Sequence, residues 1–370
     1  MKSALLEAAD FDAAIDICHS RGWTDGLPVI PATPERVERM LAAVDLPADA
    51  EIGFYPMRNR VVTLEKMAIN AVMAGCRPEH FPVVLALAQC ILDPALNLHV
   101  TSSTTGGCAL GFIVNGPVRQ ALKMNCYGNV LGPGNRATSS IGRALRFIQV
   151  NIMGSVGGAG GTPGHGRPIL DRGTVGNPAR YACFHIIENE EDFPTLAPLH
   201  VMRGFNAQDS VVTAFGMFGH FVLGNHAEQT PQEWIDTVAH HIVGAGRLYG
   251  EGFGILMVPP ESAEMFVKEG WTKADIARAL FESGRRSVEW IKTNGWKVGG
   301  RDYRSAPVLP GDEDRMVGVA GSPEEIAVVV SGGKAGAFPV WVMSYAGKTF
   351  DLVSRRVPAY AGNAEVPSWR

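Results

Sequence analysis

The sequence predicts an α/β protein, with a helical N-terminal part followed by mixed strand and helix layers joined by glycine-rich loops. Three observations predict this class: helical patterns dominate residues 1–100, buried strands and glycine turns appear in 101–230, and strands alternate with helices in 231–370. Such alternation is typical of an α/β layer. We take these three ranges as the expected regions of a chain that could also form one domain, and we find no internal sequence repeat.

The N-terminal helices are predicted from amphipathic patterns and from capping residues. The stretch FDAAIDICHSRG has the pattern of a short amphipathic helix that ends at Gly22. A proline-stiffened extended arm follows, and Thr33 with Pro34 at the first helical position then starts the next helix. The stretch RPEHFPVVLALAQCIL is apolar nearly all round, which predicts a buried helix.

The middle region alternates apolar strands with one long helix. CALGFIVNGP has the pattern of a buried strand that ends in an Asn-Gly-Pro turn, and RYACFHII and SVVTAFGMFGHFVL also have strand patterns. Between them, SSIGRALRFIQVNIM is predicted to be a helix. Its apolar face, at the 3.6-residue period, consists of Ile141, Leu145, Ile148 and Ile152.

Two capping boxes mark helix starts in the last region. Thr230 with Glu233, and Thr272 with Asp275, each have the spacing in which two side chains satisfy free backbone N–H groups. FGILMV is predicted to be a strand, and EEIAVVVSGGKAGAFPVWVMSY to be two strands around a glycine loop.

Composition and charge exclude several classes of protein. The formal net charge of −4 argues against a nucleic-acid-binding protein, which usually carries a basic excess. No apolar run reaches 18 residues, so we expect no transmembrane helix, and the first 17 residues lack a signal-peptide pattern. We therefore expect a cytoplasmic protein, and its many turns and long N-terminal arm favour a homo-oligomer.

The stretch LGPGNRATSSIGRALR, residues 131–146, predicts an anion-binding cradle. Gly132, Gly134 and Asn135 form a loop that leads into a helix N-terminus, where backbone N–H groups and the helix dipole attract negative charge. Arg136 lies at the mouth of this loop and Arg143 on the following helix. Such a set suits a carboxylate, a phosphate or a developing oxyanion. The alternative is a tight turn whose arginines pair with acidic residues.

Three further glycine turns could line the same site. Asn115-Gly116-Pro117 follows a buried strand, at the kind of strand end where α/β proteins bind ligands. Residues 157–167 form a glycine-dense loop, and the turn SGGKAG carries Lys334. That these turns converge in space is an expectation.

Acid–base chemistry is expected from the segment HIIENEEDFPTLAPLHVMRGF. Glu188, Glu190 and His200, if within reach of each other, could transfer protons or bind a divalent metal, and we expect His200 just before a strand end. The acidic run could equally be a solvated loop. The six cysteines are scattered without C-x-x-C spacing, and Cys108 is a candidate nucleophile against the alternative of an inert buried thiol.

Several of these stretches, taken in order, resemble the large-subunit-like region of the UGSC (selenocysteine-Gly-Ser-Cys) family. They are RGWTDGLPVIPATPERVERML, AGCRPEHFPVVLAL, DPALNLH, IVNGP, LGPGNRATSSIGRALR, ENEEDFPTLAPLHVMRGF, EGWTKADIARALFE and PEEIAVVVSGGKAG. The family is often labelled thiol-disulfide isomerase or thioredoxin-like, but this chain contains no C-G-S-C, so the resemblance assigns no redox residue here. The framework it implies is Asp25, Gly26, Asn115, Gly116, Pro117, Gly132, Pro133, Gly134, Asn135, Arg136, Gly142, Arg143, His200 and Arg203.

The sequence leaves three functions in competition. The first is a lyase or hydrolase for a small anionic organic acid or acyl compound, in which Arg136, Arg143 and Arg203 would bind the anion. In it, His200 would move a proton with Glu188 or Glu190, and Asn115 would bind an oxyanion. The second is the substrate-binding subunit of a thiol- or selenol-dependent reductive system, with a separate small C-G-S-C partner protein. The third is a non-catalytic ligand-binding or scaffold protein.

Overall fold

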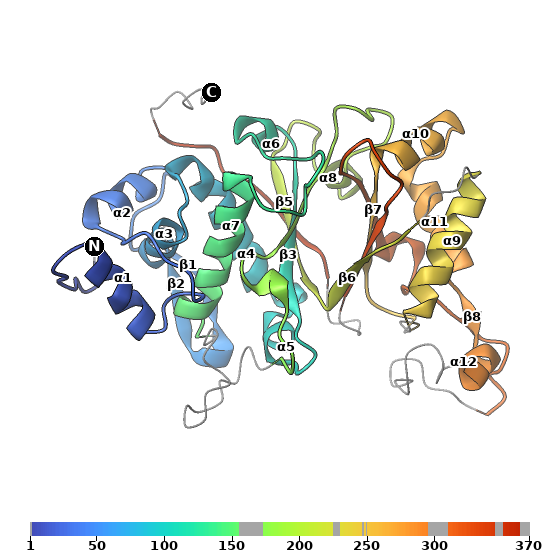
Figure 1. The fold of residues 1–370 in the computed structure, drawn as a ribbon, viewed down its shortest axis with the longest axis horizontal. Coiled ribbons are helices and arrows are strands. Elements are labelled where there is room, and N and C mark those ends of the chain that lie inside the picture. Colours follow the sequence, from blue (N-terminus) through green and yellow to red (C-terminus); the bar gives the residue numbers. More distant parts are fainter. Residues whose placement is uncertain are drawn as a thin grey trace.

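Two four-stranded sheets lie face to face, and helices cover the outer side of each, so that four layers cross Figure 1 from left to right. The α/β class predicted from the sequence is thereby confirmed. The structure is a computed structural model, and it describes residues 2–154, 173–224, 230–245, 248, 250–294, 310–344 and 351–362.

The first sheet has the strand order β12–β5–β3–β4. Strand β3 pairs with β4 in parallel and with β5 in antiparallel, and β12 joins the outer side of β5. All seven residues of β3 are buried, as the predicted buried strand requires. The bounds are β3 Ala109–Asn115, β4 Phe184–Ile187, β5 Val211–Met217 and β12 Val353–Arg356.

The second sheet, β10–β7–β11–β6, repeats the arrangement of the first. Its central strand β7 pairs with β10 in parallel and with β11 in antiparallel, and β6 adds to β11. The edge strands are exchanged between the two sheets. Strand β6 follows β5 along the chain but joins the second sheet, and β12 follows β11 but joins the first sheet. The bounds are β6 Gly219–Val222, β7 Gly254–Val258, β10 Ile326–Val330 and β11 Val340–Met343.

The fold therefore contains a topological repeat that the sequence does not display. The chain passes between the two sheets twice, after β5 and after β11, so each half completes the other half's sheet. The boundary expected at residue 230 would separate β6 from the other strands of its sheet. The three regions proposed from the sequence stay a prediction.

Helices pack on the outer faces of both sheets (Figure 1). On one side lie α1 Phe11–Ser20, α2 Pro34–Leu41, α3 Leu64–Met73, α4 Phe81–Leu92 and α7 Arg136–Phe147, which continues into a π-helical turn over Ile148–Ile152. On the other side lie α9 Pro231–Gly244, α10 Pro260–Lys268 and α11 Lys273–Ser283. The smaller elements are α5 Leu98–Ser103, α6 Val118–Ala121, α8 Leu199–Met202, α12 Val288–Asn294, and the strand pairs β1 Glu51–Tyr55 with β2 Arg60–Thr63 and β8 Arg286–Ser287 with β9 Met316–Val317.

The core follows the alternation of side chains along the strands. In β7, Ile255 and Met257 point into the core between the two sheets, whereas Leu256 and Val258 pack with the outer helices. Phe215 of the first sheet meets Phe253, just before β7, edge to face across this core, with ring centroids 6.1 Å apart. The strands β7 and β10 are thus buried on both faces, which explains their continuous apolar sequences.

The local sequence signals produce the elements that they predict. The apolar face of the predicted middle helix is buried along α7 and its π-helical turn. Both capping boxes form, with the hydroxyls of Thr230 and Thr272 accepting backbone N–H groups of Glu233 and Asp275. The expectation that His200 precedes a strand end is wrong, because the residue lies in the one-turn helix α8. In the described part of the chain, no helix combines the length and apolarity that a membrane span requires.

Candidate functional site

The carboxyl ends of strands from both sheets meet at one edge of the sandwich. The backbone N–H of Asn189, just after β4, donates to the carbonyl of Val330 at the end of β10 (2.8 Å). In return, the Ser331 hydroxyl, just after β10, donates to the carbonyl of Ile187 at the end of β4 (2.7 Å). These reciprocal bonds join equivalent positions of the topological repeat. Ligands of α/β proteins usually bind beyond such strand ends.

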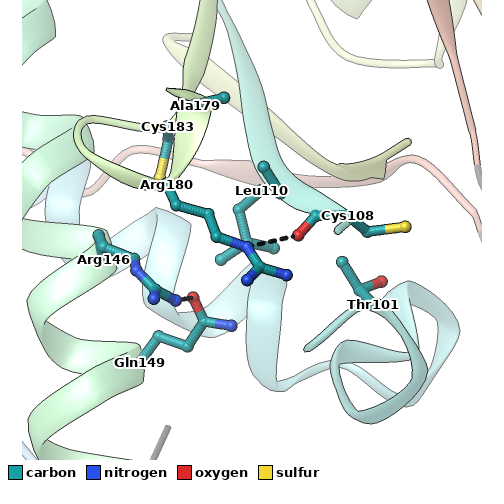
Figure 2. Close-up of a pocket in the computed structure, with 9 residues that line it drawn as sticks. Thr101, Cys108, Leu110, Arg146, Gln149, Ala179, Arg180 and Cys183 are labelled. Carbon is teal, nitrogen blue, oxygen red and sulfur yellow. Dashed lines mark hydrogen bonds between the residues drawn. The ribbon is translucent and has the colours of Figure 1, made fainter. Parts of the chain in front are cut away.

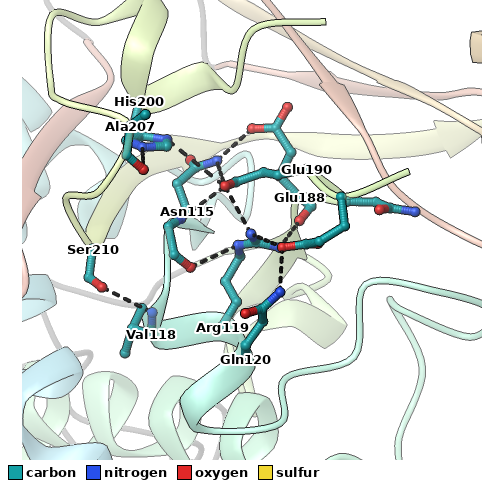
Figure 3. A network of polar contacts seen from close by, with 12 residues as sticks. Asn115, Val118, Arg119, Gln120, Glu188, Glu190, His200, Ala207 and Ser210 are labelled. Carbon is teal, nitrogen blue, oxygen red and sulfur yellow. Dashed lines mark hydrogen bonds and ion pairs between the residues drawn. The ribbon is translucent and has the colours of Figure 1, made fainter. Parts of the chain in front are cut away.

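Asn115, Glu188, Glu190 and His200 come together at this edge (Figure 3). The Asn115 amide, at the last residue of β3, donates to Glu188 Oε2 (2.6 Å) and to Glu190 Oε1 (2.9 Å). The Gly116 N–H also donates to Glu190 Oε1 (2.9 Å). The sequence proposed these four side chains as acid–base and oxyanion-binding groups from two separate segments, and the fold gathers them into one cluster. Their catalytic roles stay a prediction.

Gly116 has a structural reason to be a glycine at this point. Its φ is +77°, a left-handed conformation that other residues seldom adopt, and a Cβ would overlap the carbonyl oxygen of Asp209. The tight turn lets the chain leave β3 while its N–H points back at Glu190.

Lys273 brings a positive charge to the cluster from the opposite half of the molecule. Its ammonium group, at the start of α11, forms an ion pair with Glu188 Oε1. The Lys273 and Glu188 side chains are only 2% and 1% exposed. The other carboxylate oxygen of Glu188 accepts the Leu199 N–H (2.9 Å) in addition to the Asn115 amide. Charges buried this deeply require such partners, so the carboxylate of Glu188 is held in one position.

Arg119 extends the cluster toward solvent. Its guanidinium contacts Glu190 Oε2 (2.9 Å) and both carboxylate oxygens of Glu191 (2.8 and 3.2 Å), and it donates to the Glu188 carbonyl (2.6 Å). Burial opposes the charge on Arg119, but its hydrogen bond to Glu191 and the nearby negative charges outweigh burial and raise the pKa of Arg119. The hydrogen bond from Arg119 in turn lowers the pKa of Glu191, whose side chain is 38% exposed.

His200 is fully buried against the same cluster, and its two ring nitrogens have different surroundings. Nε2 lies 3.4 Å from the carbonyl of Ala207, an acceptor only, so it is the nitrogen that carries a proton in the neutral ring. Nδ1 is left as an acceptor, without a hydrogen bond, 3.9 Å from Glu190 Oε1. A proton taken up at Nδ1 would therefore face the charge of Glu190. The side-chain amide oxygen of Asn115, Oδ1, is also buried without a hydrogen bond.

The glycine turn leads into the N-terminus of α7 as predicted, and anion binding there stays a prediction. Gly134 adopts φ +117°, and the Asn135 side chain accepts the Thr138 N–H (3.1 Å) as the helix cap. Gly132 lies in the same turn, and Arg136 is exposed, with its guanidinium donating to the carbonyl of Gly75 (3.2 Å). Arg136 thus contacts the loop after α3 and not the carboxylate cluster.

Arg143 and Arg203 have structural partners. Arg143 forms a bidentate ion pair with Asp25 (2.7 Å for both bonds) and also donates to the carbonyl of Pro28 (2.9 Å). This fastens the extended N-terminal arm to α7, which matches the alternative that the cradle arginines pair with acidic residues. Arg203 donates to Ser354 Oγ (2.7 Å) and to the Leu352 carbonyl (2.5 Å), so it holds the C-terminal strand β12 in place. Lys334 is exposed on the turn after β10.

The cysteines offer no accessible pair of thiols. All six lie in the described residues without forming a disulfide, and Cys108 is buried with 2% of its surface exposed, at the opposite end of β3 from Asn115. Burial raises the pKa of Cys76 above its usual value and that of Cys183 to about 12, so both stay protonated. The glycine-dense loop 157–167 lies outside the described residues.

Among the described residues, no group of three His, Cys, Asp or Glu side chains is arranged to hold a metal ion. In the cluster, Arg119, Lys273 and Asn115 already occupy the carboxylate oxygens of Glu188 and Glu190.

Lys273 and Arg119 were not predicted from the sequence. Lys273 had a signal, because it occupies the first position of a capped helix, where the helix dipole disfavours a positive charge that has no partner. Arg119 follows the Asn-Gly-Pro turn on a helix of only four residues, and no periodic pattern distinguishes it.

A mainly apolar cavity of about 940 Å³ lies away from the carboxylate cluster, between the N-terminal segment, α2 and α3. None of the site residues predicted from the sequence lines it. Its buried polar groups serve the fold, since Glu65 accepts the N–H groups of Lys2 and Ser3, and Asn70 accepts the Asn151 amide (2.7 Å).

Comparison with known proteins identifies no family for this chain. No protein-family model matches the sequence, and no curated protein matches it.

Proposed function

We propose that this chain is an enzyme that transfers protons on a small organic acid or acyl compound, in an addition, elimination or hydrolysis reaction, at the Asn115–Glu188–Glu190–His200 cluster. The observation that carries the proposal is the meeting of these side chains beyond the carboxyl ends of β3, β4 and β10. Clusters of buried titratable groups at such strand ends are characteristic of active sites.

In the proposed mechanism His200 is the general base. Nε2 donates to the Ala207 carbonyl, which leaves Nδ1 to accept a proton from substrate or from water. The Glu190 carboxylate, 3.9 Å from Nδ1, stabilises the imidazolium that results. Lys273 and Arg119 fix the two carboxylates, so that neither has to reorganise during proton transfer.

Two unpaired buried atoms favour a functional cluster over a purely structural one. The side-chain oxygen Oδ1 of Asn115 and His200 Nδ1 are both buried without a hydrogen bond, although the adjacent Glu188, Glu190 and Arg119 side chains all have partners. An unsatisfied buried polar atom costs about 1–3 kcal/mol, and a network that served only to join the two sheets would gain nothing from it.

Anion recognition belongs to this proposal through Arg136, Lys334 and the backbone of residues 132–135. Arg136 and Lys334 are exposed, and the turn that carries Lys334 lies against the loop before α7, since a Cβ on Gly333 would be 3.1 Å from the Cα of Gly128. Arg143 is excluded from this role while Asp25 occupies its guanidinium. Because His200 and Asn115 are fully covered, a substrate would approach from the side of the exposed Glu191.

The test is the turnover of two kinds of substrate by the purified full chain. We expect release of p-nitrophenolate from p-nitrophenyl acetate, or hydration of crotonate or fumarate, measured as the loss of their ultraviolet absorbance. His200→Gln should lower the observed kcat/KM at least 100-fold, the usual contribution of a general base, with an unchanged Tm and circular dichroism spectrum.

His241→Gln is the matched control, because His241 is an exposed histidine on α9 that hydrogen-bonds only to the Thr237 carbonyl. It should retain full activity. Equal activity of the wild type and His200→Gln would refute the assigned base. Absence of turnover with both kinds of substrate would refute the proposed reaction classes.

A further inference from the structure

Two of the cavities among the described residues lie away from the carboxylate cluster, and they differ in size. The smaller, of about 10 Å³, lies at the opposite end of β3, where its lining includes Arg146, Arg180 and Cys108 (Figure 2), and it has room for no more than a water molecule. The larger is the mainly apolar cavity of about 940 Å³ between the N-terminal segment, α2 and α3. Its volume falls in the range of about 300–1,000 Å³ that is typical of small-molecule sites.

The N-terminal segment, residues 2–10, forms one wall of the larger cavity and is fastened at both ends. At its start, the Glu65 carboxylate of α3 accepts the backbone N–H of Ser3 (2.8 Å). At its end, the Asp10 side chain caps α1. Residues between these two points line the cavity, so its wall is held in place by the fold.

The apolar side chains around this cavity lack a packing partner. Leu5, Leu6 and Phe11 line it and are nevertheless 74%, 47% and 52% exposed. Helix α1 places Phe11, Ala14 and Ile17 on the cavity but has no buried residue. A surface helix normally buries its apolar face. A ligand with an apolar body between α1 and α3 would cover these side chains.

The charged groups in the lining favour a ligand with a negative head group. The two acidic side chains, Asp10 and Glu65, already accept backbone N–H groups. Among the described residues, neither Arg36 of α2 nor the exposed Lys66 of α3 forms an ion pair. The half-buried Arg36 guanidinium donates to the carbonyl of Pro31 (2.8 Å), which uses one of its five N–H groups. Of the two cations, Arg36 is the more covered, and a guanidinium can bind a carboxylate through two parallel hydrogen bonds.

We propose that this cavity binds an amphipathic organic anion of the fatty-acid class. Its hydrocarbon chain lies against Leu5, Phe11 and Ile17, and its carboxylate binds Arg36. No residue of the proposed catalytic cluster lines the cavity, so this site is separate from the proposed active site.

The first test is fluorescence titration of the purified full chain with cis-parinaric acid, a fatty acid whose emission rises in apolar surroundings. We expect a saturable rise, together with energy transfer from Trp23, which lines the cavity. Trp23→Phe should lower this energy transfer more than Trp271→Phe, which removes a tryptophan from the opposite half of the molecule. No saturable rise, or an equal effect of the two substitutions, would overturn the proposal.

The second test concerns the head group. Arg36→Gln should weaken binding roughly tenfold, because it removes the charged partner of the carboxylate. Arg39→Gln, at an exposed arginine of the same helix outside the lining, should leave binding unchanged. Tetradecanoate should displace the probe, and tetradecyltrimethylammonium, with the same chain length and the opposite charge, should do so at least about tenfold less effectively. Equal displacement by the two compounds would overturn the choice of an anion.

The third test fills the cavity. Ala14→Trp should abolish probe binding with an unchanged circular dichroism spectrum, whereas Ala9→Trp, at an exposed position outside the lining, should retain it. Binding by Ala14→Trp that equals that of the wild type would place the probe elsewhere and overturn the site. A second copy of this chain is the alternative occupant of the apolar face. Probe binding that weakens as the protein concentration rises, with a dimer in size-exclusion chromatography, would favour that copy over the fatty acid.

Discussion

Replacing Lys273 by methionine should destabilise the protein strongly, although the side-chain volume hardly changes. The substitution leaves the Glu188 carboxylate, 1% exposed, without its cationic partner. Breaking a buried ion pair from one side typically costs about 3–5 kcal/mol. Glu188 would keep two hydrogen bonds, from the Asn115 amide (2.6 Å) and the Leu199 N–H (2.9 Å), so we expect the lower end of that range, about 3 kcal/mol.

The measurement is Tm by differential scanning calorimetry. Unfolding entropy of about 2.1 cal/mol/K per residue makes 3 kcal/mol equivalent to a loss of about 4 °C for a chain of 370 residues. The double variant Lys273→Met/Glu188→Gln should recover much of this loss, because it no longer buries an unpaired charge.

Lys268→Met is the control, since Lys268 is an exposed lysine at the end of α10 and should change the stability by no more than about 0.5 kcal/mol. If Lys273→Met lowers Tm no more than Lys268→Met, the charge of Lys273 contributes nothing to the cluster. If the double variant is as unstable as the single one, the loss does not come from the unpaired carboxylate of Glu188. Either result would refute the reasoning.

Two further predictions concern the fold. Burial, together with the charges of Arg136 and Arg77, lowers the pKa of His80 from 6.5 to about 3. Only the unfolded chain then gains a proton below pH 6.5, which costs about 1.4 kcal/mol per pH unit, or about 2 kcal/mol between pH 6.5 and pH 5. His80→Gln should lose this decline in urea unfolding, and an unchanged pH dependence would show that His80 is not its source. Gly142→Ala should destabilise by about 2 kcal/mol or more despite the better helix propensity of alanine, because a Cβ would overlap the Ala182 carbonyl oxygen. Ser139→Ala on the same helix is its control in the same assay, and a Gly142→Ala protein as stable as that control would contradict the expected overlap.

Local signals in the sequence predicted most of the elements. The capping boxes at Thr230 and Thr272 and the 3.6-residue apolar face of α7 depend on neighbours within four residues, so the sequence displays them directly. The exchange of β6 and β12 between the sheets depends on pairings between distant segments, such as Val353 with Ala214, and no short pattern encodes it.

The site could be predicted only in part, for the same reason. Residue chemistry selected Asn115, Glu188, Glu190 and His200, and the fold brings them together. The cradle arginines show the limit of that approach, because the partner of Arg143 is Asp25, 118 positions away in the sequence. Whether an arginine binds a substrate or another part of the chain depends on a contact that composition and spacing do not determine.

The topological repeat offers a comparison within the molecule that bears on function. The ends of β4 and β10 occupy equivalent places and exchange reciprocal hydrogen bonds. After β4 the chain carries Glu188-Asn189-Glu190, whereas after β10 it carries Ser331-Gly332-Gly333. The two reciprocal bonds use only a backbone N–H, two carbonyl groups and the Ser331 hydroxyl, and the second turn takes part in them without any charge. The carboxylates of the first turn, which Lys273 and Arg119 hold in place, add charges that the second turn lacks, and the proton transfer that we propose for His200 would account for them.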